Sequence, residues 1–407
     1  MKFSISQLKL SKPINQFLII QAIGIVWMAY LHASGQMFPA SVLLTINCLL
    51  FIFRYGQLSF FSETGLNRIF ILLTITSVIS FTNYLYYERY TGGLFFNCTL
   101  FQLFCYSLLW VNIYIFFYIY VRRNNNYDIV YIFAILFFIA GIINNFRSYQ
   151  YFRVVNDTLA QHHYYYFTLQ CLPLLLMRVH SWKKYILILI VTLCSIYAFK
   201  RAGIIVCGGI LLANIIIDTH YKFHRLVGLL FIVSGIFYGT YYFMKGNENI
   251  DRIIQRIENI QDDKGSGRGE NFVDVYNEIS HAPIENKILG YGFMSMLSKH
   301  KHMVDVEIAS MYYYYGIIGL ILYLLFHCFM IFRFFSIIKS KNKEIINLSA
   351  SFASCYMIFL IYSIAGEVFT YHYLFIMVFV YLGTIEGLYY NKKQFVINDK
   401  RNNKMKI

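Results

Sequence analysis

The sequence is poor in charged residues and in proline. Only 14% of its 407 residues are Asp, Glu, Lys or Arg, whereas a soluble globular domain carries about 25%. Hydrophobic residues make up 58%, more than a soluble chain of this length can bury. The composition therefore excludes a cytosolic enzyme and, despite a net charge of +15, a soluble nucleic-acid-binding protein. With four prolines and no repeat of fixed period, the apolar stretches have little interruption.

The sequence also lacks the usual metal and nucleotide motifs. It has no Cys-x-x-Cys or His-Glu-x-x-His pattern and no glycine-rich phosphate loop of the Walker type. The eight cysteines all fall inside apolar stretches, which indicates small buried side chains rather than disulfides or metal ligands. His300 and His302 have no third ligand at a useful spacing. We therefore expect neither a metal nor a cofactor.

Long apolar stretches dominate what is present. A helix needs about 20 apolar residues to cross the hydrocarbon core, and a shorter one can cross if it is packed or tilted. The candidate spans are 14–33, 37–54, 68–87, 94–121, 128–143, 164–180, 184–199, 202–217, 226–244, 308–335, 346–364 and 368–390. Strands of a membrane barrel would instead be about 10 residues long, with alternating polarity. The sequence therefore predicts an all-α, polytopic integral membrane protein with about 12 transmembrane helices.

The positive charges indicate how the chain lies in the membrane, because Lys and Arg in short loops are retained on the cytoplasmic side. With the N-terminus in the cytoplasm, most of the 35 Lys and Arg residues fall on the inner side. The short outer loops carry five: Arg89, Arg147, Arg153, Lys200 and Arg201. We therefore expect cytoplasmic termini, an uncleaved first span, and an outer loop over 144–163 that contains Arg147 and Arg153.

One long hydrophilic stretch divides the chain. It runs from 245 to 307 and is predicted to be a large, helical extracytoplasmic loop. Residues 1–244 before it and 308–390 after it form the N-terminal and C-terminal sets of transmembrane helices. Residues 391–407 form a basic cytoplasmic tail, which we expect to be solvated and to contact anionic lipid headgroups.

The long loop contains two amphipathic helical patterns. Isoleucines recur at helical spacing from Ile250 to Ile260, which predicts a helix at the membrane–water boundary. The glycine-rich segment 265–269 breaks this helix. A second helix follows, with apolar positions at Phe272, Val275, Tyr276 and Ile279, and the segment His281-Ala282-Pro283 ends it.

Five short segments follow one another in a distinctive order. They are Lys200-Arg201-Ala202-Gly203, Gly267-Arg268-Gly269-Glu270, His281-Ala282-Pro283 through Gly290-Tyr291-Gly292, Asp305-Val306-Glu307, and Gly316 to Gly319. In this order, and around a large outer loop, they resemble the O-antigen polymerase/O-antigen ligase superfamily of membrane glycosyltransferases. The resemblance covers roughly 195–325, and the N-terminal half is similar to the family in hydropathy only.

The resemblance implies that the protein joins oligosaccharide repeat units carried on undecaprenyl pyrophosphate. The reaction takes place on the outer side of the bacterial plasma (inner) membrane, with the long loop in the periplasm and no nucleic acid involved. The ligase branch usually has a His before its Gly-Leu-Ile-Gly span. Here that position is near Asp305, which favours the polymerase of an O-antigen or similar surface polysaccharide.

Two alternatives stay open. One is an O-antigen ligase, which transfers finished polymer to a lipid A-core acceptor. The other is a transporter or flippase of lipid-linked oligosaccharide, which we would expect to carry charges within its spans, whereas the ionisable residues here cluster at span ends. The implied partners are lipid-linked oligosaccharides, membrane lipids, and a chain-length regulator and flippase of the same pathway.

The implied reaction needs fixed cations for the leaving pyrophosphate. Arg suits this role because its planar guanidinium forms two parallel charge-assisted bonds with phosphate. Arg201 is the first candidate, since a cation between two apolar stretches is costly and rarely idle. Arg268 is the second, because its flanking glycines permit close backbone approach to a ligand. The alternatives are a snorkelling pair with Lys200 and an ordinary solvated Arg.

Other basic residues are weaker candidates for binding phosphate or glycan. They are Lys200, Arg252, Arg256, Arg147 and Arg153. For Arg252 and Arg256, which share one helix face, the alternative is an ordinary solvated surface.

The acceptor hydroxyl is helped by a general base, typically Asp, Glu or His. Asp305 and Glu307 stand directly before the next span, and their spacing predicts that only one of them faces the site. His281 is a further candidate. The alternatives are acidic residues favoured by a helix N-terminus, for the first two, and a helix-end cap for His281.

Overall fold

The computed structural model describes eleven stretches of the chain. They are residues 12–30, 37–87, 99–154, 164–179, 182–197, 201–219, 268–292, 306–339, 348–365, 368–369 and 372–404. All the regular secondary structure in these residues is helical, as the sequence predicts.

The helices follow the predicted apolar stretches closely. Their bounds are α1 Pro13–Tyr30, α2 Met37–Tyr55, α3 Leu58–Ser62, α4 Gly65–Tyr87, α5 Leu100–Ser107, α6 Leu109–Asn124, α7 Asp128–Val154, α8 Tyr164–Leu176, α9 Lys183–Tyr197, α10 Arg201–Thr219, α13 Arg268–Ser280, α14 Ile284–Leu289, α16 Glu307–Ile338, α18 Ser349–Ala365 and α19 His372–Lys404. The predicted span 226–244 and the predicted helix at Ile250–Ile260 lie outside the described residues.

Several helices are long and apolar enough to cross a membrane. In the described residues these are α2, α4, α7 and α16, and α5 and α6 together qualify as one span bent by 52°. α1, α8, α10 and α18 are apolar but shorter. The chain is therefore an all-helical membrane protein with four or five such spans in the described part, and the count of about 12 stays a prediction.

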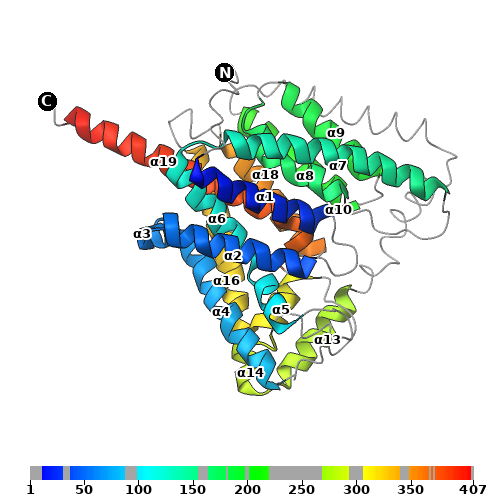
Figure 1. Cartoon of the computed structure of the whole chain (residues 1–407). Helices are drawn as coiled ribbons and strands as arrows, with labels where there is room; N and C mark the ends of the chain where they lie inside the picture. The colour runs from blue at the N-terminus through cyan, green and yellow to red at the C-terminus, as the bar shows by residue number, and fades with distance from the viewer. Residues whose placement is uncertain are drawn as a thin grey trace.

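Four pairs of helices pack along each other in the bundle (Figure 1). The pairs are α6 with α19, α7 with α8, α1 with α2, and α10 with α18. Helix α6 is buried from Leu109 to Val121 except at Asn112. At Gly383 of α19, a β-carbon would overlap the backbone carbonyl of Tyr114 in α6, so this small residue permits the close contact of the two helices.

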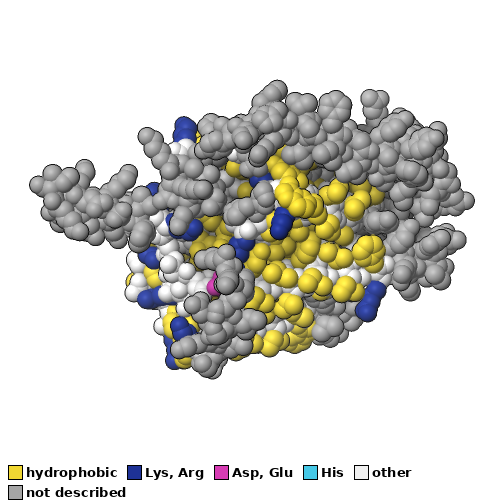
Figure 2. Space-filling view, turned by 90° about the horizontal axis from the view of Figure 1, so that it is seen from above, with side chains coloured by type: hydrophobic (Ala, Val, Ile, Leu, Met, Phe, Trp, Pro, Cys, Tyr) yellow, Lys and Arg dark blue, Asp and Glu magenta, His cyan; other side chains and the backbone are white. Residues whose placement is uncertain are grey.

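The outer surface of the bundle is broadly apolar. Figure 2 shows a hydrophobic face with Lys and Arg side chains gathered mainly toward the end from which α19 projects in Figure 1. Exposed apolar side chains include Ile23, Leu136 and Phe332. So large an apolar surface is unfavourable in water, whereas in a bilayer it contacts lipid chains. This surface is what a membrane-integral bundle requires.

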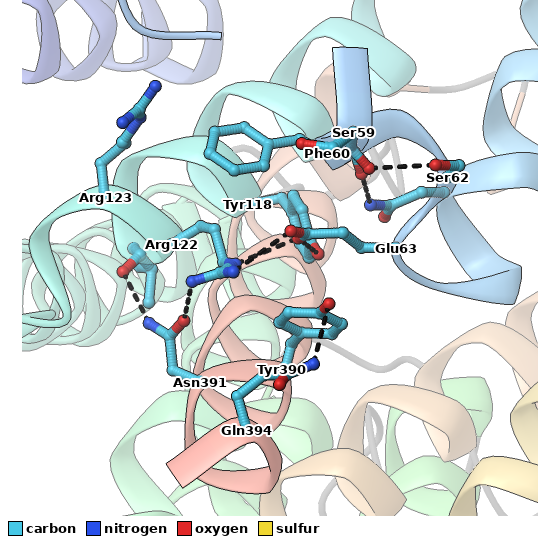
Figure 3. Close-up of polar contacts among 12 residues, drawn as sticks. Ser59, Phe60, Ser62, Glu63, Tyr118, Arg122, Arg123, Tyr390, Asn391 and Gln394 are labelled. Carbon is cyan, nitrogen blue, oxygen red and sulfur yellow. Dashed lines mark hydrogen bonds and ion pairs between the residues drawn. The ribbon is translucent and has the colours of Figure 1, made fainter. Parts of the chain in front are cut away.

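A polar network ties α6 to α19 beside the segment that joins α3 to α4 (Figure 3). Arg122 of α6 donates to the two carboxylate oxygens of Glu63 at 3.0 and 3.2 Å, and to Asn391 of α19 at 2.7 Å. The Tyr118 hydroxyl donates to Glu63 at 2.6 Å. The guanidinium also lies 4.6 Å from the ring centre of Tyr390. The half-buried Arg122 is thus paired and hydrogen-bonded on several sides.

Two further ion pairs join helices. Arg333 of α16 donates to both oxygens of Glu386 in α19 at 2.9 and 2.8 Å, and Glu386 is fully buried. Arg178, which follows α8, pairs with Asp128 at the start of α7. The arginines of all three pairs belong to segments that the sequence predicts on the cytoplasmic side.

Helix α7 is longer than the hydropathy predicts. The first part of the predicted outer loop over 144–163 is helical, because α7 continues to Val154 and includes Arg147 and Arg153. The polarity of the side chains shows where a helix leaves the apolar layer of the membrane but not where the helix ends. Its backbone hydrogen bonds are internal, so it can continue from lipid into water. Likewise, α19 continues as a helix through the basic tail to Lys404.

The described cysteines are free, and most are buried as predicted. The buried ones are Cys48, Cys105, Cys171, Cys194, Cys207 and Cys355. Cys328 is exposed on the apolar surface of α16, which a small hydrophobic side chain tolerates in contact with lipid.

Candidate functional site

Helix α16 is interrupted at Gly316. The backbone angles of Gly316 are φ 64° and ψ −163°, which a residue with a side chain rarely adopts. A break of this kind leaves carbonyl groups of the preceding turn without their helical donors. Buried in the bundle, these carbonyls need other partners. The break divides α16 into a short first segment, Glu307–Tyr315, and a long second segment that crosses the bundle.

The partners come from the Gly290-Tyr291-Gly292 turn. The amide of Tyr291 donates to the Tyr313 carbonyl at 2.8 Å, and the amide of Gly292 donates to the Tyr314 carbonyl at 3.0 Å. Gly290 and Gly292 have φ values of 77° and 96°, which allow the chain to turn there. The turn therefore supplies amide donors to the two carbonyls of α16 that have no helical donor at the break.

The two backbones are in direct contact, which only glycine permits. A β-carbon at Gly290 would overlap the carbonyl of Tyr314, and one at Gly316 would overlap the carbonyl of Ile288. We call this contact between the turn 290–292 and the break at Gly316 the glycine junction. Two sequence motifs that were identified separately are thus two halves of one structure.

Helix α4 holds the glycine junction from the side. The Asn83 amide donates to the Gly290 carbonyl at 2.6 Å and to the side-chain oxygen of Asn286 at 3.1 Å. The buried Ser80 hydroxyl donates to the Tyr314 carbonyl. Sequence reasoning missed both residues, because a single Ser or Asn in an apolar helix carries no motif. Figure 1 shows α14 at the end of α4.

Helix α13 packs on the first segment of α16, as the second amphipathic pattern predicts. Val275 and Ile279 are buried, whereas Phe272 and Tyr276 are exposed, so the buried face is narrower than predicted. The Tyr313 hydroxyl donates to Glu278 of α13 at 3.1 Å. The ring of Tyr291 stacks on that of Tyr313 with 4.9 Å between ring centres. The junction thus connects α13, α14 and α16.

Glu307, a candidate base, is fully buried at the start of α16. Its carboxylate accepts the backbone amides of Val368 and Phe369, the latter at 3.1 and 3.2 Å, from the segment between α18 and α19. These bonds anchor the start of α16 to the segment between α18 and α19. Asp305, two residues earlier, lies outside the described residues.

His281, the third candidate base, is exposed between α13 and α14. Its Nδ1 lies 2.8 Å from the carbonyl oxygen of Asn277. Nδ1 also lies 3.1 Å from the Ser280 hydroxyl, and in the tautomer in which Nδ1 donates to the carbonyl, Nε2 is the nitrogen that can accept a proton. The alternative prediction of a helix-end cap also fits, because this bond satisfies a carbonyl of the last turn of α13.

The two leading arginine candidates both begin helices. Arg268 is the first residue of α13, and Arg201 is the first residue of α10. The side chains of both lie outside the described part of the chain. On α13, the buried Val275 and Ile279 follow position 268 by seven and eleven residues. The helix position of residue 268 is therefore in line with these two buried residues.

Position 201 lies on a different kind of helix face. It is in line with Ile205, Leu212 and Ile216 of α10, whose side chains are 59%, 50% and 62% exposed. Arg201 thus stands at the end of an apolar stripe of the bundle surface. Lys200, Arg252 and Arg256 lie outside the described residues.

Helix contacts place Arg147 near the start of α10. The amide of Asn145 in α7 donates to the Cys194 carbonyl of α9 at 3.3 Å. Arg147, which is exposed, follows two residues later, and α9 ends at Tyr197, shortly before Arg201. Arg153 lies further along α7, beyond the residues whose side chains are described.

This end of the bundle is the one that carries Glu307. Arg178, after the end of α8, pairs with Asp128 at the start of α7, and Gly141 in the middle of α7 is in contact with Thr168 of α8. The two helices therefore run antiparallel. Arg147, six residues after Gly141, lies level with the start of α8. There Tyr166 packs on Tyr362 of α18 and Phe375 of α19, on either side of the segment that Glu307 anchors. Arg147 and Glu307 thus lie at one end of the bundle, together with the helix start at position 201.

The described residues bring three features to this end. They are the exposed Arg147, the buried carboxylate of Glu307, and the exposed apolar stripe of α10 that begins beside position 201. Among the described residues, no cluster of His, Cys, Asp and Glu has the geometry of a metal site.

A family model matches the C-terminal part of the chain. Residues 245–385 match the model of a family described as O-antigen ligase like membrane protein. The matched range begins in the long loop, contains the glycine junction and extends into α19. The match confirms the resemblance to the O-antigen polymerase/O-antigen ligase superfamily and leaves the preference for the polymerase branch open. No curated protein matches the chain.

Proposed function

We propose that this protein polymerises undecaprenyl-pyrophosphate-linked oligosaccharide repeat units into a cell-surface polysaccharide, such as an O-antigen. One observation carries the proposal. The two glycine motifs on which the resemblance rests meet in one backbone junction, inside the range matched by the family model. The apolar helical bundle supports it, because the polyprenyl tail of such a substrate stays in the bilayer.

The proposed reaction is a single group transfer. A hydroxyl of the acceptor sugar attacks the anomeric carbon of the donor sugar and forms the new glycosidic bond. The bond from that carbon to the pyrophosphate oxygen breaks, and lipid pyrophosphate leaves with the bonding electrons. The hydroxyl proton passes to a general base. No oxidant, reductant or nucleotide is required.

Arg201 and Arg268 are the proposed pyrophosphate ligands. Arg201 stands at the end of the exposed apolar stripe of α10, where a lipid-borne pyrophosphate can reach a cation while its tail stays in lipid. Position 268 is in line with the buried Val275 and Ile279 of α13. Both would oppose the charge that develops on the leaving group, which is where preorganised cations lower a barrier most. Lys200, Arg147, Arg153, Arg252 and Arg256 are proposed to contact further phosphate or glycan.

Asp305 is the proposed general base. The carboxylate of its neighbour Glu307 already accepts backbone amides in a buried position, which suits an anchor for the segment that carries Asp305. Glu307 as the base is the second choice, because it would have to exchange these bonds for the substrate. His281 offers an exposed Nε2 and is the third.

The polymerase is preferred to the ligase because Asp305 stands near the position where the ligase branch usually has a His. The proposed place of the reaction is the periplasmic side of the bacterial inner membrane, with both termini in the cytoplasm. A flippase would deliver the substrate to this side, and a chain-length regulator of the same pathway is a proposed partner.

The test is a gel of surface polysaccharide from a strain that lacks the protein, with the same strain carrying the gene on a plasmid as control. We expect the ladder of polymer lengths to collapse to core plus a single repeat and to return in the control. Bare core with accumulated lipid-linked polymer would show a ligase instead. An unchanged ladder would contradict both for that polysaccharide.

A further inference from the structure

We infer that Asn83 and Ser80 of α4 are positioning residues for the transfer reaction, because they fix the glycine junction in the geometry that places the candidate bases. This inference rests on the proposed function and adds two residues to it. They lie more than 200 positions from the segments they contact and outside the range that the family model matches.

Asn83 restrains the turn side of the junction. Its amide nitrogen carries two protons, and the two short contacts use both: one to the carbonyl of Gly290 at 2.6 Å and one to the side chain of Asn286 at 3.1 Å. Asn286 is itself buried within α14. One side chain thus fixes both the last turn of α14 and the glycine at which the chain reverses.

Ser80 restrains the α16 side of the junction. Its hydroxyl donates to the carbonyl of Tyr314, which also accepts the amide of Gly292. A carbonyl has two lone pairs, so it can accept both. Ser80 and Asn83 are three residues apart and therefore lie on one face of α4. From this face α4 is hydrogen-bonded to both halves of the glycine junction.

The three threonines of α4 use their hydroxyls differently from Ser80. Thr74, Thr76 and Thr82 donate to the carbonyl four residues earlier in their own helix, at 2.8 to 2.9 Å. That is the ordinary behaviour of a hydroxyl in a helix. Ser80 reaches a different helix instead, although it could make the same local bond.

The junction lies between the two segments that carry the candidate bases. On one side, α14 begins directly after His281-Ala282-Pro283. On the other, the first segment of α16 leads back from Tyr315 to Glu307 and Asp305. A shift of about 1 Å in the relative position of reacting groups can reduce a rate about a hundredfold. A substitution that loosens the glycine junction should therefore lower the rate of transfer, although it removes no group that contacts the substrate.

The experiment compares Asn83→Ala and Ser80→Ala with Thr82→Ala in the full-length protein, purified in lipid nanodiscs. Thr82 is the matched control, because it neighbours Asn83 and bonds only within α4 in the described contacts. Two properties are measured. One is the hydrogen exchange of the amides of Tyr291 and Gly292. The other is the kcat and KM for polymer formation from undecaprenyl pyrophosphate that carries one repeat unit.

We expect each variant to raise amide exchange at Tyr291 and Gly292 by about tenfold or more, because these amides open with the junction. We expect kcat to fall about tenfold to a hundredfold while KM stays within about threefold, since positioning acts after binding. Thr82→Ala should change neither property.

The outcomes separate this inference from the proposed function. Faster exchange with unchanged kcat, or unchanged exchange in both variants, would overturn the positioning role. If the wild-type protein forms no polymer from this substrate, the proposed function fails, and with it the claim for that reaction. Hydrogen exchange would then still show whether α4 holds the junction. If Asn83→Ala does not insert into the membrane, Ser80→Ala, which removes a single oxygen atom, tests the positioning role alone.

Discussion

At the scale of single residues, Gly316 is, like Gly290, a position at which both the backbone angles and the neighbouring backbone exclude a side chain. It combines a positive φ with backbone contact to Ile288 and Gly290. A strained φ costs about 1–3 kcal/mol, and the overlap of a β-carbon with a carbonyl adds to that cost. We expect Gly316→Ala to open the glycine junction and to abolish polymer formation while the protein still inserts.

The control for this substitution is Gly208→Ala in α10, where no described atom lies within 4 Å of the new β-carbon. Alanine in a helix interior is favoured over glycine by about 1 kcal/mol, so this variant should be at least as stable as the wild type. The measurement is the polysaccharide ladder, together with the thermal unfolding of the purified proteins. A full ladder in Gly316→Ala would show that the junction is not needed.

The two arginines make a second residue-scale prediction. Arg201→Ala and Arg268→Ala should each abolish polymer without loss of insertion, because each would remove a cation from the leaving pyrophosphate. Losing one such contact costs about 3–4 kcal/mol of transition-state stabilisation, which is a factor of about a hundred or more in rate. Arg201→Lys should also be impaired if bidentate geometry matters.

The control is Arg123→Ala, since Arg123 lies on α6, is exposed, and donates to the Tyr55 carbonyl in the segment predicted to be cytoplasmic. The readout is the polysaccharide ladder, with the amount of inserted protein measured by immunoblot. Normal polymer in both Arg201→Ala and Arg268→Ala would remove the pyrophosphate-clamp hypothesis.

At the scale of helices, the ion pair between α16 and α19 is a buried link whose two partners can be removed separately. Glu386→Gln leaves the guanidinium of Arg333 without a counter-charge in a site where Glu386 is fully buried. Removing one partner of a buried pair costs about 3–5 kcal/mol, whereas replacing both by apolar residues is often neutral. We therefore expect Glu386→Gln to lower the unfolding temperature and Arg333→Met with Glu386→Leu to restore it.

Thermal unfolding in one detergent measures both variants. A double variant as unstable as Glu386→Gln would mean that the pair itself, and not the unpaired charge, stabilises the contact of the two helices. A single variant as stable as the wild type would show that solvent or lipid headgroups reach the guanidinium.

Sequence patterns predicted helices well and contacts between helices poorly. The lengths of the apolar stretches sufficed for the helices, because each is a local property of the chain. Hydropathy misplaced the end of α7, since it reports the environment and not the backbone. The sequence motifs included the two glycine segments but not the junction between them. Gly290 and Gly316 come into contact only after the chain between them folds back.

The candidate site shows the same limit. Arg268, His281, Asp305 and Glu307 became candidates from the order of short segments and remain predictions, and the structure adds that Glu307 is bonded to the backbone of 368–369. Ser80 and Asn83 could not be recognised, because their partners are set by tertiary contact alone. Polar residues in an apolar helix become informative only when it is known what they touch.

At the scale of the whole molecule, the distribution of charge predicts the direction in which the bundle lies. The ion pairs of Arg122, Arg178 and Arg333 belong to segments predicted on the cytoplasmic side, and α13, α14 and Glu307 belong to the other. We expect alkaline phosphatase fused after residue 267 to be active, and the same enzyme fused after residue 404 to be inactive. Green fluorescent protein at these positions should give the opposite pattern.

This measurement bears on function as well as topology. The proposed substrate is a lipid-linked oligosaccharide that has already been moved to the outer side of the membrane, and the proposed cations and bases belong to segments predicted on the same side as α13 and α14. If that end faced the cytoplasm, Arg201 and Arg268 would meet no such substrate, and the polymerase and ligase readings would both fail. If it faces the periplasm, as the 35 Lys and Arg residues predict, the site stands where the substrate arrives.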